Sequence, residues 1–398
     1  CLMMSPITVS QFLAPPVNGP QFDVVIFDEA SQVVPEDAVC CIARGRQIVI
    51  VGDNRQLPPT RFFDRLVEMN GEGELEDLES ILDACGTIGL RQKMLLWHYR
   101  SRQEPLISFS NRTLYDGKLF TMPSADPGKH GEGIELIYVK DGVYDRGGRR
   151  DNGIEAGVVA DMVIEQFLSH PDLSLGVVAF SQAQQEAIED RLEYKVKTMI
   201  KENPDLGRLF DEDVPEPFFV KNLENVQGDE RDVMIFSVGY GKDDKGVMTM
   251  NFGPLNQEGG ARRLNVAITR ARRSVKVVSS IRSSDIQVGR DGPAGVVLLK
   301  EYLDHAESRG AKTMPPKGSA LPQSKLEESI AEALEARGYH VVRSIGTSSM
   351  KVDLGVKDPS KEGRFLLGIL CDGASYKAGR SVRDREIVRE AVLNNLGW

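Results

Sequence analysis

Two adjacent carboxylates, Asp28 and Glu29, end a short apolar run in the segment FDVVIFDEA (22–30). Hydrolysis of a nucleoside triphosphate needs one carboxylate to hold Mg²⁺ and a second to orient or deprotonate the attacking water. Adjacent carboxylates at the end of a strand supply both groups. A strand that ends in Asp-Glu is about as often a plain capped turn, so this pair alone leaves the function open.

A second turn, GDNRQLPP (52–59), follows the apolar run RQIVIVGD (46–53). Gly52 admits unusual backbone angles, and Pro58 with Pro59 stiffens the exit from the turn. Gln56 is an uncharged donor and acceptor, which suits a sensor of the γ-phosphate. An ordinary loop is the alternative, but the position of the turn after DEAS favours the sensor.

Two later segments carry arginines, whose fixed fork of donors can stabilise the charge that develops in phosphoryl transfer. Arg100 precedes an expected helix in LLWHYRSRQEPLISFSN (95–111), and Arg270 follows an amphipathic stretch in RRLNVAITRARR (262–273). Between them, VQGDERDVMIFS (226–237) places polar residues directly before an expected strand. The other candidates in these segments are Tyr99, Gln227, Gly228, Glu230 and Arg272, whereas a solvated basic face explains Arg262, Arg263 and Arg273 equally well.

Short Val- and Ile-rich runs alternate with helix-length segments, which is typical of an α/β fold with a parallel sheet buried on both faces. In such sheets the chemistry collects at the carboxyl ends of the strands, where both Asp-containing turns lie. The expected strands lie in 22–30, 46–53, 173–180, 231–240 and 274–280.

The alternation predicts four parts of the chain. Residues 1–95 hold the end of one α/β domain, and residues 96–290 form a complete second one. A helix and a linker rich in Pro, Gly and Ser occupy 291–323. Residues 324–398 form a third, small α/β domain.

The 398 residues carry a net charge of −10, and the pI near 5.3 taken alone argues against a nucleic-acid partner. Local charge matters more for phosphate contacts, and basic residues crowd 262–276 and 380–389. Acidic residues gather in 71–80 and 211–217, which we expect to be exposed loops or solvated helix faces. No apolar run approaches the ~20 residues of a membrane span. Five cysteines without a CxxC pair favour a reducing cytoplasm over a disulfide framework or a zinc site.

The ordered series DEAS, GDNRQLPP, HYRS, NGIEA (152–156), VQGDERD and NVAITRAR resembles motifs II to VI of superfamily 1 helicases. It is most similar to the 5′→3′ branch, which includes RNA-surveillance and DNA-replication helicases. The resemblance covers roughly residues 1–285 and implies RecA-like motor domains that use ATP and Mg²⁺ and bind nucleic acid.

The resemblance also implies roles for single residues. Asp28 would hold Mg²⁺, Glu29 would activate water, and Gln56 would sense the γ-phosphate. Arg100 and Arg270 would contact phosphate. Glu230 would bind the ribose, Tyr99 and Gly228 would line the nucleotide site, and Gln227 and Thr269 would couple the nucleotide to the nucleic-acid groove. The segment VVAFSQAQQEAI departs from the usual Thr-Pro-Tyr form and keeps Gln184, which would contact the nucleic-acid backbone.

No GxxxxGK[ST] sequence occurs in the chain, so the β- and γ-phosphates have no P-loop to cradle them. In the family this element precedes motif II. Because the chain also lacks an initiator Met, we expect it to be a fragment that is inactive as an ATPase without the missing N-terminal motor half.

The C-terminal part places Glu327 in an expected helix and Asp353 on an expected strand, before the strand and loop GILCDGASYK (368–377). This order suits a metal-dependent phosphodiesterase, although a strand Asp near a turn is more often structural. The string from SKLEESIAEALEARGY to the C-terminus resembles the very-short-patch-repair-like branch of the restriction-endonuclease superfamily. Asp353 would then be the metal ligand, with Asp372, Lys377 and Glu327 as helpers.

Two departures bear on that resemblance: Leu370 and Lys377 stand where many relatives have an acidic residue and His. An active nuclease and an inactive fold kept for DNA binding both stay open. For the whole chain the leading hypothesis is part of an ATP-driven DNA helicase or translocase that tracks along single strands. The alternatives are a non-catalytic module for nucleic-acid binding and partner docking, or an RNA helicase.

Overall fold

The computed structural model describes residues 1–59, 78–126, 132–310, 324–371, 373, 376 and 381–398. The chain forms two compact units, Cys1–Met94 and Leu95–Trp398, which are described here one at a time.

The first unit is built on two parallel strands, β1 (Phe22–Phe27) and β2 (Gly45–Ile50). Their helices begin at capping signals of the sequence: Ser5 and Ser80 each accept a hydrogen bond from the first turn, and Pro35 opens the helix after β1. These helices are α1 (Pro6–Phe12), α2 (Pro35–Ile42) and α4 (Ile81–Thr87), with the short 3₁₀ turn η1 (Ala30–Gln32) after β1.

The expectation that these strands are buried on both faces is wrong for this chain. Val24, Ile26 and Val49 are 45%, 66% and 40% exposed. Among the described residues of this unit, the helices pack on one side of the two-stranded sheet, where Phe27 and Ala30 contact Ile81. A fully apolar strand therefore does not establish that both of its faces are covered within the same chain.

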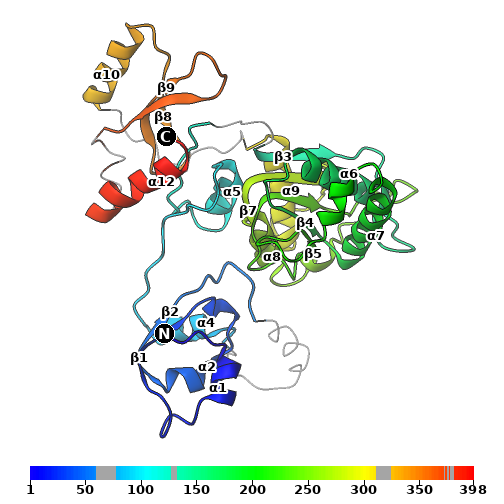
Figure 1. Ribbon diagram of the computed structural model, residues 1–398, viewed down its shortest axis with the longest axis vertical. Helices are drawn as coiled ribbons and strands as arrows, with labels where there is room; N and C mark the ends of the chain where they lie inside the picture. The colour runs from blue at the N-terminus through cyan, green and yellow to red at the C-terminus, as the bar shows by residue number, and fades with distance from the viewer. Residues whose placement is uncertain (60–77, 127–131, 311–323, 372, 374–375, 377–380) are drawn as a thin grey trace. The chain divides into compact units, whose positions relative to one another are not determined.

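The second unit contains a five-stranded parallel sheet in the order β3-β7-β6-β4-β5 (Figure 1). The three central strands are almost entirely buried and match the predicted strands, whereas the two edge strands were not predicted. The strands are β3 (Gly133–Tyr138), β4 (Leu175–Ala179), β5 (Phe219–Asn222), β6 (Arg231–Ser237) and β7 (Ala271–Ser279).

Helices cover both faces of this sheet, and successive side chains of β6 point alternately to the two faces. Val233 and Ile235 pack with α6 and α7, whereas the Phe236 ring lies 6.4 Å from the Tyr302 ring of α9 on the other face. The helices are α5 (Pro105–Thr113), α6 (Gly153–Ser169), α7 (Gln182–Met199), α8 (Gly260–Ile268) and α9 (Ala294–Glu307), with 3₁₀ turns at Pro204–Arg208, Gly253–Asn256 and Ser283–Asp285.

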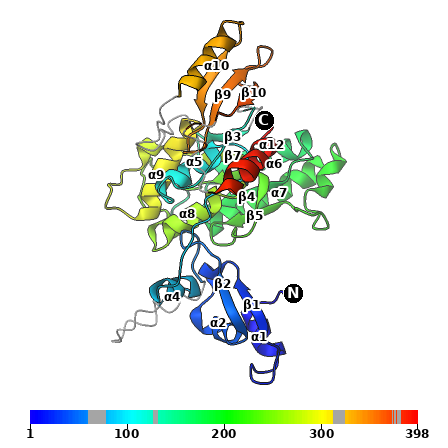
Figure 2. The ribbon, with the colours of Figure 1, turned by 90° about the vertical axis from the view of Figure 1, so that its left-hand side faces the viewer.

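The C-terminal part of the second unit is a three-stranded antiparallel sheet in the order β10-β9-β8 (Figure 2). Helix α10 packs on it through Ala331, which contacts the cluster of Val341 and Leu354. The elements are α10 (Lys325–Glu335), β8 (Val341–Ile345), β9 (Val352–Lys357), β10 (Phe365–Ile369), the π-helical turn η5 (Asp384–Val388) and α12 (Arg389–Asn395).

No helix in the described residues is both long and apolar enough to cross a bilayer.

Candidate functional site

The two candidate carboxylates of the first unit are exposed at the carboxyl end of β1. The Glu29 N–H donates to Asp28 Oδ1 at 3.0 Å, and Glu29 has the left-handed backbone angles φ 50° and ψ 40°. A non-glycine residue adopts this conformation uncommonly, and the hydrogen bond stabilises it here. Within the described residues no basic side chain pairs with either carboxylate. Both groups are exposed, and Glu29 Oε2 accepts from Gln32 Nε2 at 3.4 Å.

The second turn lies directly against the first. The Ala30 N–H donates to the Val51 carbonyl at 2.9 Å. A Cβ atom at Gly52 would lie 2.9 Å from the Ser31 nitrogen, so only glycine fits here without displacing the backbone. Gln56 is held by Asp53, whose Oδ2 accepts from Gln56 Nε2 at 3.1 Å. The structure therefore brings three predicted residues, Asp28, Glu29 and Gln56, onto adjoining turns.

In the second unit, three segments that are far apart in the sequence meet at the amino end of the sheet. Arg102 donates its N–H to the Arg272 carbonyl at 2.7 Å, and Arg231 donates its N–H to the Arg270 carbonyl at 3.2 Å. Arg100 forms an ion pair with Glu230. The candidate site of this unit thus lies at the amino ends of β6 and β7, and Glu230 directly precedes β6 as expected.

The turn that carries Arg100 has a defined internal structure. The Ser101 N–H donates to His98 Nε2 at 3.1 Å, so this nitrogen is the acceptor and the imidazole is neutral. Burial, with the nearby Arg100 charge, lowers the pKa of His98 to about 4. Tyr99 is 70% exposed, and the side chains of Arg100 and Glu230 are 39% and 36% exposed. This turn therefore presents a ring and a guanidinium group to solvent.

The other predicted residues of this unit have structural roles of different kinds. Gly228 has φ +85° and so needs glycine for its backbone conformation, and the Gln227 Nε2 atom is buried with no hydrogen-bond partner among the residues that the structure describes. Arg270 is only 4% exposed, and its Nε donates to the Val266 carbonyl at 2.7 Å. The Thr269 hydroxyl donates to the Asn265 carbonyl at 2.9 Å. In this arrangement Arg270 and Thr269 stabilise the end of α8.

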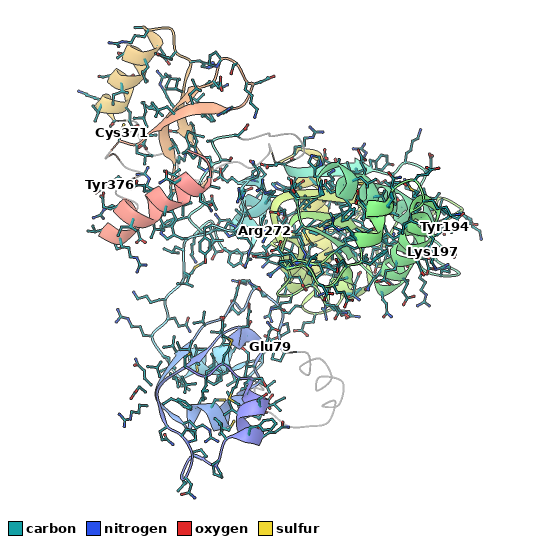
Figure 3. All side chains as sticks on the ribbon, in the orientation of Figure 1. Glu79, Tyr194, Lys197, Arg272, Cys371 and Tyr376 are labelled. Atoms are coloured by element: carbon teal, nitrogen blue, oxygen red, sulfur yellow. The ribbon has the colours of Figure 1, made fainter. Side chains whose placement is uncertain are left out.

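The basic and acidic stretches neutralise each other to an extent that the sequence did not predict. Arg272, labelled in Figure 3, is bound through both terminal nitrogens by Glu216 from the acidic stretch 211–217. The hydrogen bond from Arg272 lowers the pKa of Glu216 to about 2. Arg273 pairs with Asp232 and Glu132. Residues 212–215 are exposed as expected, whereas Glu216 is partly buried by its ion pair with Arg272.

A buried polar network that the sequence did not predict lies at the carboxyl end of the same sheet. Glu155, in the first turn of α6, is fully buried, and its carboxylate accepts hydrogen bonds from Ser237, Gly239 and Ser280. Burial raises the pKa of Glu155 to about 7, although these hydrogen bonds favour the charged form. The only signal in the sequence was the NGIEA segment, to which no role had been given.

Gln184 belongs to the same network. It is fully buried, its Oε1 accepts from the Asn152 N–H at 2.7 Å, and its Nε2 donates to Ser237 Oγ at 3.0 Å. In this conformation Gln184 joins the first turns of α6 and α7 to β6 and does not itself face solvent.

In the C-terminal part, Asp353 lies on β9 and is 6% exposed. Its Oδ2 accepts from the Cys371 N–H at 2.7 Å and lies 3.8 Å from the Arg389 guanidinium nitrogen Nη2; Cys371 is labelled in Figure 3. Glu327 is also buried, and its Oε1 lies 2.6 Å from the position of a Cβ atom at Gly373. Asp353 and Glu327 thus converge on the loop after β10.

Among the described residues, the surroundings of Asp353 are basic and apolar. A buried arginine already supplies the positive charge beside Asp353, and Leu370 is apolar and 42% exposed. In the described residues, no three His, Cys, Asp or Glu side chains are grouped so that they could hold a metal ion. Lys377 and Asp372, which we had named as helpers, lie outside the described residues.

Comparisons with known proteins identify the family of the chain. A family model described as an AAA domain matches residues 78–282, about half of the chain, and a second AAA-domain model matches residues 8–63. This chain belongs to the AAA-domain family of superfamily 1 helicases. A restriction-endonuclease (REase) family model matches residues 326–398, so the chain also carries a nuclease-like domain in its C-terminal part.

Several of its curated relatives are named as helicases. The uncharacterized ATP-dependent helicase MG140 homolog of Mycoplasma pneumoniae is 34% identical over 298 residues, and helicase MG140 of Mycoplasma genitalium is 33% identical over 302 residues. Each match covers 72% of this chain and 26% of the relative. The probable helicase MAGATAMA 3 of Arabidopsis thaliana is 27% identical, and the match covers 77% of this chain and 35% of the relative. The chain therefore spans about a quarter of the length of the first two relatives.

Proposed function

We propose that this chain supplies the second motor domain, and the catalytic carboxylates of the first, to an ATP-dependent DNA helicase or translocase. The observation that carries the proposal is the meeting of residues 98–102, 230–231 and 270–272 at one end of the sheet. Backbone hydrogen bonds hold these segments together, and two charged side chains, Arg100 and Glu230, stay partly exposed there. A phosphate-contacting site is consistent with exposed charge at this position.

The roles that we propose for the residues of the first unit follow from the exposure of their side chains and from their hydrogen-bond and ion-pair partners. Asp28 and Glu29 are exposed and have no basic partner among the described residues, so Asp28 would hold hydrated Mg²⁺ and Glu29 would take a proton from the attacking water. When it is bound, Mg²⁺ would neutralise charge on the phosphate oxygens. Gln56 is oriented by Asp53 and would detect the γ-phosphate.

Arg100 is the arginine whose geometry best suits contact with ATP. Its present partner Glu230 is equally exposed, so a phosphate could replace that carboxylate without leaving a buried charge unpaired. Glu230 would then be released to bind the ribose. Arg270 could act only after leaving its contacts with α8, so we propose Arg100 as the principal arginine and Arg270 as a second one.

The proposal also includes a P-loop, which this sequence lacks and which the full-length protein would supply. It places the motor in the cytoplasm, on single-stranded DNA bound mainly through phosphates. Such binding is insensitive to base sequence and weakens with salt.

The test is the ATPase activity of the full-length protein with single-stranded DNA or RNA of the same sequence. We expect DNA to stimulate turnover and Glu29→Gln to abolish it. Asp23→Asn is a matched control, because Asp23 is an exposed carboxylate of β1 whose ion-pair partner among the described residues is Arg46. Stimulation by RNA alone would favour an RNA helicase, and absence of ATP turnover would leave the non-catalytic binding module.

A second proposal concerns the nuclease-like domain, which we propose binds nucleic acid without cleaving it. The support is the buried Asp353–Arg389 pair together with the apolar Leu370. The test is a Mg²⁺-dependent nicking assay on supercoiled plasmid beside a gel-shift assay. Nicking by the wild-type protein that Asp353→Ala removes would contradict this proposal and establish an active nuclease.

A further inference from the structure

The nuclease-like domain contacts residues 96–126 of the same unit through a mixed apolar and polar surface, here called the seam. Its apolar part joins Phe120 and Met122 to Met350, Val352 and the α12 residues. Trp97 and Trp398 border this cluster, and their rings pack on Phe120 and Phe365, respectively. A shared core of this kind distinguishes docking from loose tethering, in which each domain would bury its own apolar surface.

Hydrogen bonds across the seam are specific. Ser348 Oγ accepts from the Thr121 N–H at 3.2 Å and donates to the Thr121 carbonyl at 2.8 Å. The Phe365 N–H donates to the Ala125 carbonyl at 2.8 Å, and Trp398 Nε1 donates to the Pro123 carbonyl at 2.7 Å. Because buried polar groups are costly unless they are paired, these bonds select one docking geometry.

Two residues of the seam bracket the turn that carries Arg100 (residues 98–102, here called the Arg100 turn). On one side, Trp97 Nε1 donates to Asp384 Oδ1 at 3.0 Å. On the other side, the Thr347 N–H donates to both carboxylate oxygens of Glu104, at 2.9 and 3.1 Å. Glu104 is 8% exposed and also accepts from the Thr121 hydroxyl at 2.6 Å.

We infer that the nuclease-like domain positions Arg100, because both residues that bracket the Arg100 turn are held by that domain. Trp97 and Glu104 are then positioning residues for the proposed ATPase, and Asp384 and Thr347 are their partners. The expected effect on ATP hydrolysis rests on the proposed function. The positioning of Arg100 itself does not require ATP. It gives the nuclease-like domain a task in the motor that is independent of any cleavage.

The first test measures positioning in the 398-residue chain by hydrogen exchange. The Arg102 and Ser101 amides are hydrogen-bonded inside the Arg100 turn or to Arg272, so their exchange reports on its order. Trp97→Phe keeps a ring beside Phe120 but removes the donor to Asp384. We expect exchange at these amides to become about tenfold faster in Trp97→Phe and in Glu104→Gln.

Trp398→Phe is the matched control. It makes the same substitution at the same seam, but its lost hydrogen bond is to Pro123, away from the Arg100 turn. We expect it to weaken docking without faster exchange at residues 98–102. Unchanged exchange at residues 98–102 in Trp97→Phe and Glu104→Gln would overturn the inference, and equally faster exchange in all three variants would overturn the assignment of Trp97 and Glu104 as the positioning residues.

The second test measures catalysis in the full-length protein. Trp97→Phe and Glu104→Gln should lower kcat by about tenfold with KM changed less than twofold, because the positioning of a transition-state contact is lost. Trp398→Phe should leave kcat within twofold of the wild type. Faster exchange in the turn with an unchanged kcat would overturn the catalytic part of the inference. A wild-type protein that does not hydrolyse ATP would instead overturn the proposed function, and hydrogen exchange alone would then decide the positioning.

Discussion

The Asp353 carboxylate lies 3.8 Å from the Arg389 guanidinium group, and the two side chains are only 7% and 2% exposed. Arg389 also donates to the Lys351 carbonyl at 2.8 Å, so the pair ties α12 to β9. Loss of one partner of a buried ion pair leaves the other charge in a medium that solvates it poorly.

Asp353→Ala should therefore unfold more easily than the wild type, with a loss of roughly 3–5 kcal/mol in the free energy of unfolding of this unit. Urea unfolding monitored by circular dichroism measures the change. The exposed pair of Glu335 and Arg343 in the same domain provides the control, and Glu335→Ala should change the urea midpoint little. Similar losses for the two variants would show that burial of the Asp353 pair is not important for stability.

Arg100→Ala should lower the kcat of the full-length ATPase by roughly 10³-fold, the effect of removing an arginine that stabilises phosphoryl transfer. Arg100→Lys should recover little of this loss, because an ammonium group lacks the planar fork of donors. Arg102→Ala is the control, since Arg102 is exposed in the same turn and contributes its backbone N–H to Arg272. An Arg102→Ala enzyme as slow as Arg100→Ala would refute the assignment.

The pKa of Glu155 near 7 predicts a pH dependence of stability. The ordinary value is 4.5, so the folded protein binds more protons than the unfolded chain between these pH values. The stability contributed by this group is therefore complete below pH 4.5 and is lost as the pH rises through 7. Thermal unfolding from pH 5 to 8 should show that Glu155→Gln removes this decline. Glu165→Gln, on the exposed side of the same helix, should retain it.

Gly52→Ala should destabilise the first unit, because the added Cβ would lie 2.9 Å from the Ser31 nitrogen and 3.1 Å from the Ala30 nitrogen. We expect a loss of roughly 1–3 kcal/mol, as for other overpacked sites. Gly157→Ala, within helix α6, meets no atom within 4 Å and should be neutral or slightly stabilising. Thermal unfolding of both variants provides the comparison, and a neutral Gly52→Ala would exclude a close approach of the two turns.

The central strands of the second unit were predictable because burial on both faces leaves continuous Val- and Ile-rich runs. The edge strands β3 and β5 were missed, since an edge strand is only partly buried and its residues are more mixed. The placement of Asp28, Glu29 and Gln56 on adjoining turns was likewise readable from the order of strand and turn. Their roles in ATP hydrolysis stay predictions.

Some properties of single residues could not be predicted, because they depend on partners that are distant in the sequence. Glu155 resembles an ordinary first-turn carboxylate of a helix, and its burial depends on Ser237 and Ser280, which belong to two other strands or their ends. Arg272 resembles a phosphate-binding group until Glu216 is placed beside it. In both cases a local pattern gives the residue type, but only tertiary pairing decides whether the charge is available to a ligand.

Trp97 and Trp398 are the two tryptophans of the chain, and both indole N–H groups donate hydrogen bonds across the seam. The tryptophan fluorescence of this chain therefore comes entirely from two residues at the seam. Undocking would expose both indoles to water and shift their emission to longer wavelength. The protein carries a label-free optical reporter of the association between its motor and its nuclease-like domain, readable in a stopped-flow instrument as ligands are added.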